Sequence, residues 1–96
     1  MKVGFWSAKG KEIPIDPDWK KLNKSTYQSV IRFLQDPDRS VPYKGLSSCR
    51  ICKKFNGSEE CTNDGIIYPY GYIHYIKDHG VVPDDAVISA ATRGGY

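Results

Sequence analysis

Two cysteines and two histidines occur in this chain with the spacing of a metal site, and no other feature of the sequence restricts the fold as much. Cys49 and Cys52 are separated by two residues, so one tight turn can direct both sulfurs at a single ion. His74 and His79, the only histidines of the chain, follow after 21 further residues. Structural zinc sites have four tetrahedral nitrogen or sulfur ligands, often a close cysteine pair and a histidine pair. The sequence therefore predicts one zinc ion held by these four side chains.

The interval between the two histidines predicts where they lie on a helix. Residues 70–80 have the pattern of a helix of two to three turns, and Gly80 is suited to end it. Five positions of a straight α-helix rotate His79 about 140° away from His74, which is too far for one face. We therefore expect His79 at the point where the helix ends or tightens.

The stretch between the cysteine pair and the histidine pair is longer than in a minimal zinc finger. A β-hairpin accounts for the excess, with strands over residues 57–62 and 65–70. The turn sequence Asn63-Asp64-Gly65 suits the positive φ angles of a tight hairpin turn. The predicted order is thus a cysteine knuckle, a hairpin and a helix that carries the second ligand pair.

This order resembles the treble-clef zinc finger over about residues 45–82. The segment also resembles a group of small bacterial proteins of unassigned function that share a set of short motifs. In this chain the motifs are the CRxC sequence from Cys49 to Cys52, Asn56-Gly57, Asp64-Gly65, Pro69 with Gly71, His74-Tyr75 and the later His79. Tyr70 and Tyr72 flank the glycine here, where an acid and a leucine are more usual. The resemblance implies a zinc-binding module and no activity.

The remaining pattern predicts a single small α+β domain with two β-hairpins and three short helices. The first hairpin is expected over residues 2–15 with its turn at Gly10, and the first helix over 24–35. The last helix is expected over 83–92, with Pro83 in its first position, before a tail that should fray. The domain would comprise an N-terminal part (1–44), a zinc-binding core (45–82) and a C-terminal part (83–96).

Size and cysteine content favour a bound metal inside the cell. A chain of 96 residues with 40% hydrophobic residues can form only a small core, which a metal ion would reinforce. The number of cysteines is odd, and we find neither a signal-like apolar run at the N-terminus nor a stretch that could span a membrane. We expect a soluble cytoplasmic protein with reduced thiols. Cys61, in the predicted hairpin, is expected to be a buried thiol, with the alternative that it replaces one histidine ligand.

Four protein ligands would leave no position open for water, so the predicted zinc is structural and the protein is expected to have no enzymatic activity. Neither a nucleophile-elbow motif nor a phosphate-binding glycine loop is present. The alternative is a zinc-dependent hydrolase in which one ligand is lost and Glu59, Glu60 or Asp78 acts as general base.

The charge distribution indicates what the protein binds. Residues 1–54 carry 12 Lys and Arg against 5 acids, a balance of +7, whereas residues 55–96 carry 2 against 6, a balance of −4. The cations near the cysteines are Lys44, Arg50, Lys53 and Lys54, and the aromatic residues Tyr43 and Phe55 flank this set on either side. Such a mixture is typical of nucleic-acid binding. A polyanion, most plausibly nucleic acid, is therefore one expected partner.

The alternative partner is a protein. The tyrosine-rich segment 66–76 could supply interface anchors, such as an exposed Tyr70 and Tyr72, for an adaptor or an inhibitor. Most tyrosines of this segment are nevertheless expected in the core, because a small zinc domain needs amphipathic aromatic side chains around its centre. Neither a membrane nor a small-molecule substrate is expected.

Overall fold

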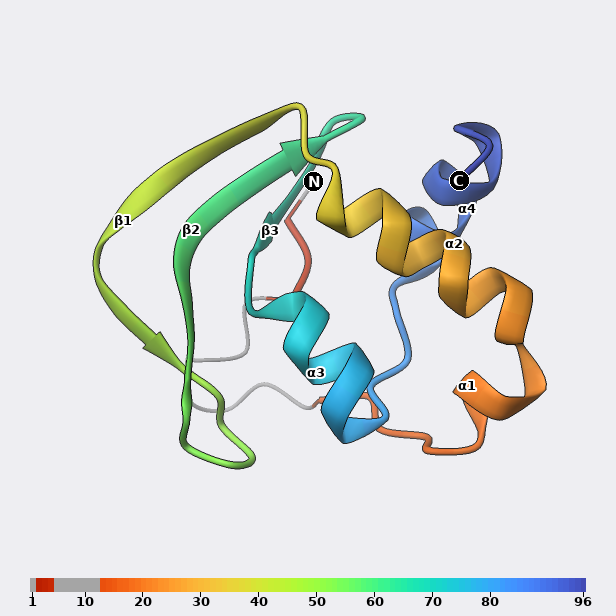
Figure 1. Ribbon diagram of the computed structural model, residues 1–96, viewed down its shortest axis with the longest axis horizontal. Helices are drawn as coiled ribbons and strands as arrows, with labels where there is room; N and C mark the ends of the chain where they lie inside the picture. Colours follow the sequence, from red (N-terminus) through yellow and green to blue (C-terminus); the bar gives the residue numbers. More distant parts are fainter. Residues whose placement is uncertain (1, 5–12) are drawn as a thin grey trace.

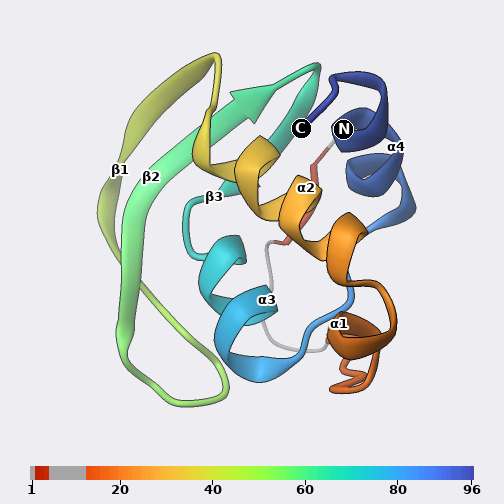
Figure 2. The ribbon, with the colours of Figure 1, turned by 45° about the vertical axis from the view of Figure 1, so that its right-hand side comes forward.

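The computed structural model describes residues 2–4 and 13–96, without the side chains of residues 43–47 and 55–58. The described part contains four helices and a three-stranded antiparallel sheet in the order β1-β2-β3. The elements are α1 (Trp19–Leu22), α2 (Lys24–Gln35), β1 (Arg39–Ser48), β2 (Phe55–Asn63), β3 (Ile66–Pro69), α3 (Tyr72–His79) and α4 (Asp85–Arg93). Figure 1 and Figure 2 show the sheet on one side of the molecule and α2 and α4 on the other, with α3 between them.

The α+β class predicted from the sequence is confirmed. The short helix α1 precedes α2 and was not predicted. The predicted N-terminal hairpin falls largely on residues 5–12, which lie outside the described part of the chain. Within the described helices none is long and apolar enough to cross a membrane.

The hairpin between β2 and β3 follows the prediction, except that Asn63, expected in the turn, is the last residue of β2. Cys61 is paired with Tyr68 and Asn63 with Ile66, which leaves Asp64 and Gly65 as a two-residue turn. Both turn residues have positive φ angles, 51° and 77°, as a turn compatible with the right-handed twist of the strands requires. The hairpin therefore forms where local turn chemistry specifies it.

This hairpin also secures the end of α2. The side-chain amide of Asn63, a buried residue, donates hydrogen bonds to the carbonyl oxygens of Phe33 (2.9 Å) and Asp36 (3.0 Å). The hydroxyl of Tyr68 donates to the carbonyl oxygen of Leu34 at 2.7 Å. The last carbonyl groups of a helix lack intrahelical partners, so these bonds supply donors at the end of α2, in addition to the N–H of Asp36 that reaches Phe33.

The apolar core lies between α2, α4, β3 and α3. Its fully buried members include Val30 and Leu34 of α2 and Val87 of α4. Helix α4 begins at Asp85, with Asp84 as N-cap: the Asp84 carboxylate accepts the N–H of Ala86 at 2.9 Å.

The C-terminal tail makes specific contacts with α2. The ring of Tyr96 meets Phe33 edge-on, with 5.4 Å between the ring centroids. The hydroxyl of Ser29 donates a hydrogen bond to the backbone oxygen of Tyr96 at 2.7 Å. Tyr96, in the segment expected to fray, is thus partly buried against the core.

Candidate metal centre

The turn between β1 and β2, residues 49–54, forms the knuckle that carries both cysteines. The N–H of Cys49 donates to the carbonyl oxygen of Lys54, and the N–H of Lys53 donates to that of Cys49, each at 2.9 Å. Lys53 takes a positive φ of 65°, which lets the chain reverse at this point. The backbone N–H of Ile51 donates to the Cys49 sulfur at 3.4 Å. The knuckle therefore presents its sulfurs inside a turn closed by its own backbone.

The two histidines come from the first and last turns of α3. His79 is the last helical residue, and Gly80 follows with a left-handed φ of 65°. The N–H of Gly80 bonds to the carbonyl oxygen of Tyr75, the five-residue spacing of a π-type turn. Because such a turn contains more residues than an α-turn, five positions come closer to one full rotation. The helix thus ends at His79 as expected, and its last turn is wider than an α-turn and not tighter.

The structure brings the four predicted side chains together. The ligand atoms of Cys49, Cys52, His74 and His79 all lie within 4.8 Å of one another. The two histidine Nε2 atoms are 3.2 Å apart, and the Cys52 sulfur is 3.4 Å from His74 Nε2. Around a tetrahedral zinc ion, bond lengths of about 2.0–2.1 Å to nitrogen and about 2.3 Å to sulfur separate two nitrogens by about 3.3 Å, and nitrogen from sulfur by about 3.5 Å. These contacts are therefore compatible with a shared zinc ion.

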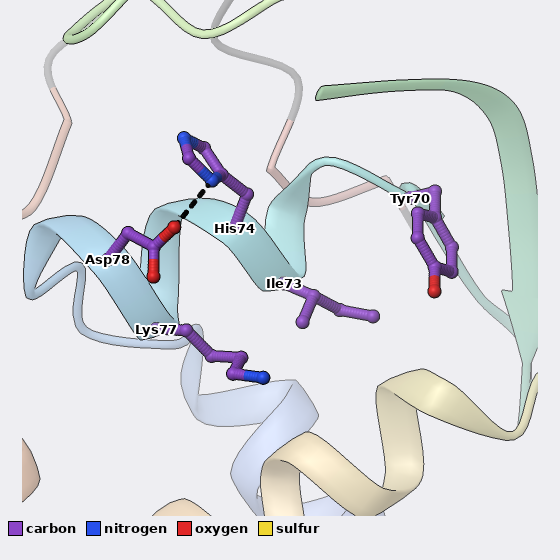
Figure 3. A pocket seen from close by; sticks show the side chains of 5 residues that line it. All are labelled: Tyr70, Ile73, His74, Lys77 and Asp78. Carbon is purple, nitrogen blue, oxygen red and sulfur yellow. Dashed lines mark ion pairs between the residues drawn. The ribbon is translucent and has the colours of Figure 1, made fainter. Parts of the chain in front are cut away.

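Groups around the four side chains orient them. Figure 3 marks an ion pair between His74 and Asp78, which is one turn further along α3. The carboxylate oxygen of Asp78 lies 2.9 Å from His74 Nδ1. A hydrogen bond at Nδ1 directs the lone pair of Nε2 toward the cluster, as is usual for metal-bound histidine. The hydroxyl of Tyr75 accepts the N–H of Arg50 at 2.8 Å, which joins α3 to the knuckle. Desolvation, together with a hydrogen bond to the Cys49 sulfur, raises the pKa of Tyr75.

The electrostatics of the site favour a thiolate at Cys52. The hydrogen bond from the backbone N–H of Lys54 is the main cause that lowers the pKa of Cys52 to about 6, in opposition to desolvation. Hydrogen bonds with His74, His79 and Cys49 lower it further. The thiolate is the form that binds metal, so the knuckle backbone prepares this sulfur for a cation.

Cys61 lies away from this cluster, although all three cysteines are free thiols. It is fully buried in β2, where its sulfur is 3.5 Å from the hydroxyl of Ser40. Burial raises the pKa of Cys61, so its thiol stays protonated. Its surroundings are those of a small buried side chain.

The cations predicted to bind a polyanion are only partly described. Lys53 and Lys54 are exposed on the knuckle, and Arg50 is half-buried. The side chain of Lys44, in β1, lies outside the described part. The structure thus offers two exposed lysines next to the cluster of Cys49, Cys52, His74 and His79.

The tyrosine-rich segment is mostly buried. Tyr68, Tyr72 and Tyr75 are at most 2% exposed, whereas Tyr70 is 46% exposed. The expectation of an exposed Tyr72 is therefore wrong. Its ring packs beside Gly4, and its hydroxyl accepts the N–H of Asp84 at 2.9 Å. Tyr70 alone of this segment remains available for a partner.

The carboxylates considered as general bases occupy different positions. Asp78 contacts His74, whereas Glu59 and Glu60 belong to β2 and pair with residues of β1.

The contact between Asp78 and His74 could have been predicted from the sequence, because residues four apart on a helix face each other. The contact of Tyr75 with Arg50 could not have been predicted, since it joins two elements 25 positions apart.

Neither a scan against models of protein families nor searches of curated proteins and of solved structures found a match to this chain. The interpretation of its function therefore starts from the geometry of the cluster.

Proposed function

We propose that Cys49, Cys52, His74 and His79 hold one structural zinc ion. The observation that carries this proposal is the convergence of four nitrogen and sulfur donors within 4.8 Å. The order of knuckle, β2–β3 hairpin and α3 supports a treble-clef-like zinc finger. Four protein donors leave no position for a substrate or a water molecule, so the module is non-enzymatic and the hydrolase alternative is not favoured.

Metal analysis of the purified protein tests this proposal. Native mass spectrometry of the full chain should show one zinc ion per chain, and Cys52→Ser should abolish it. Ser48→Ala, on an exposed residue beside the knuckle, is the matched control and should retain the ion. A folded wild-type protein that contains no zinc after purification in zinc-supplemented medium would refute the proposal.

We further propose that the knuckle contacts nucleic acid. Lys53 and Lys54 are exposed there, residues 49–54 contain no acid, and the closed turn with its metal would hold both cations in place. Rigid cations lose little entropy when they meet phosphates. A reducing compartment, the cytoplasm, suits thiolate ligands of this kind.

Binding measured at several salt concentrations tests the second proposal. Each phosphate contact releases counterions, so log affinity should fall linearly with log salt, with a slope near −0.9 per contact on a duplex. The double variant Lys53→Glu with Lys54→Glu should weaken binding to every sequence alike and flatten the slope. The control is Lys21→Glu with Lys24→Glu, which changes the net charge equally on α1 and α2. Equal losses in both double variants would contradict a site on the knuckle.

A protein partner that binds through Tyr70 is the second candidate, because this side chain is 46% exposed. Its binding would depend little on salt and would be lost in Tyr70→Ala.

A further inference from the structure

Next to the cluster of the four proposed zinc ligands, α3 borders a shallow pocket of about 210 Å³. Its lining residues are Tyr70, Ile73, His74, Lys77 and Asp78. Figure 3 shows Ile73 and Lys77 projecting on the side of α3 that faces Tyr70, while His74 projects away toward the knuckle. Pockets that enclose a whole small ligand have volumes of roughly 300–1,000 Å³, so this one can receive a single planar ring and not a larger molecule.

Tyr70 gives this pocket an exposed aromatic wall. Among the aromatic side chains whose burial the structure describes, Tyr70 is the exposed one, at 46%. Its backbone is fixed, because the N–H of Tyr70 donates to the carbonyl oxygen of Glu59 at 3.0 Å and its own oxygen accepts the N–H of Ile73 at 3.3 Å. The ring is thus held at the junction of β3 and α3 without being covered.

The lining of the pocket carries one cation and one carboxylate. Lys77 is exposed at its border. Asp78 is the only acid that lines it, and its carboxylate lies 2.9 Å from His74 Nδ1. On the other side of His74, the Cys52 sulfur is 3.4 Å from Nε2. The two residues after Cys52 in the chain are the exposed Lys53 and Lys54. Lys77 thus borders the pocket itself, whereas Lys53 and Lys54 belong to the knuckle on the other side of His74.

We propose that Tyr70 and Lys77 form a notch for one base of a single-stranded nucleic acid. The base stacks on the ring of Tyr70, an adjoining phosphate meets Lys77, and the strand continues over His74 to Lys53 and Lys54. Stacking on an aromatic side chain combined with cations along the backbone is how proteins bind single strands with little sequence preference. This inference rests on the proposed binding of nucleic acid by the knuckle and adds the preference for unpaired bases.

Fluorescence anisotropy with matched probes tests the notch in the zinc-loaded full chain. The probes are a short oligothymidylate, an abasic strand of the same length, the duplex of the oligothymidylate, and an oligouridylate. The wild type should bind the oligothymidylate between about fivefold and about a hundredfold more tightly than the abasic strand, since both carry the same phosphates. The oligouridylate should also bind more tightly than the abasic strand, because its bases offer a stacking face whether the sugar is ribose or deoxyribose.

Substitutions at the notch separate stacking from charge. Tyr70→Ala should remove the preference for the oligothymidylate and leave the abasic strand and the duplex unchanged, with zinc content and thermal midpoint intact. Tyr70→Phe should retain the preference, because it keeps the ring. Lys53→Glu should weaken all probes together.

Two results would overturn the notch, in distinguishable ways. Equal affinity of the wild type for the oligothymidylate and the abasic strand, or an equal loss of both in Tyr70→Ala, would reject the notch and leave a knuckle that binds phosphates alone. Failure to bind any probe at low salt would reject the binding of nucleic acid as well, and would favour a protein partner at Tyr70.

Discussion

The two sides of this small domain are held together by different means. On one side, α2 and α4 bury apolar side chains such as Leu34 and Val87 completely, and the partly buried Tyr96 packs against this core. On the other side, the knuckle meets α3 through sulfur, imidazole and hydroxyl groups, although α3 also contributes Ile76 to the core. Burial of apolar groups stabilises the first side without any ligand, whereas the second side gathers polar donors that a cation would hold. The comparison predicts that metal removal and core truncation affect different parts of the molecule.

Loss of the metal should have the largest effect. Structural zinc contributes an apparent binding free energy on the order of 10–16 kcal/mol, comparable to the whole stability of a domain of this size. Cys49→Ser should therefore lower zinc content and the free energy of unfolding together. Hydrogen exchange should show the first loss of amide protection in the knuckle and α3. A metal-free variant with wild-type stability would show that the two sides do not differ in this way.

Truncation of the apolar side should come next. Leu34→Ala, at a fully buried position of α2, should reduce the free energy of unfolding by about 2–5 kcal/mol in denaturant titrations. The folded fraction should still contain one zinc ion. Leu22→Ala makes the same chemical change on α1 at a position that is 81% exposed, so its effect should stay within about 0.5 kcal/mol. Loss of zinc from folded Leu34→Ala would show that the two sides are not separable.

The orienting carboxylate should matter less than the ligands. Asp78→Asn replaces the partner of His74 Nδ1, and the removal of such a partner lowers metal affinity by about 10–100-fold. Competition with a chromophoric chelator measures this change directly. Glu59→Gln, on an exposed residue of β2, is the isosteric control and should leave zinc affinity unchanged. An unchanged affinity in Asp78→Asn would exclude this role for Asp78.

The smallest effect is expected at Cys61, the cysteine outside the cluster. Cys61→Ser places a hydroxyl in a buried site and should cost about 1–2 kcal/mol of stability, with zinc stoichiometry unchanged. Native mass spectrometry and thermal unfolding provide the two measurements. If Cys61→Ser lost zinc while His79→Ala kept it, the fourth ligand would have to be reassigned to Cys61.

Elements whose formation depends on adjacent residues were predictable. The helix over residues 24–35 was predicted with the bounds of α2, and the Asp64-Gly65 turn and the Gly80 end of α3 were placed correctly. Each depends on periodicity or on a residue that tolerates a positive φ, which are properties of a short segment. The burial of Tyr72 was not predicted, because a tyrosine carries no local sign of which face it will occupy.

By itself the sequence determined the donor types, their spacing and the turns that separate them, because these are set by residue chemistry and by chain reversals a few residues long. Only the tertiary structure decided that the last turn of α3 widens, so that His79 comes to 3.2 Å from His74. It likewise decided that Tyr75 reaches the backbone of the knuckle and that Tyr70 alone of its segment stays exposed. The contact of Tyr75 and the exposure of Tyr70 result from packing between elements distant along the chain, and no pattern within one element specifies them.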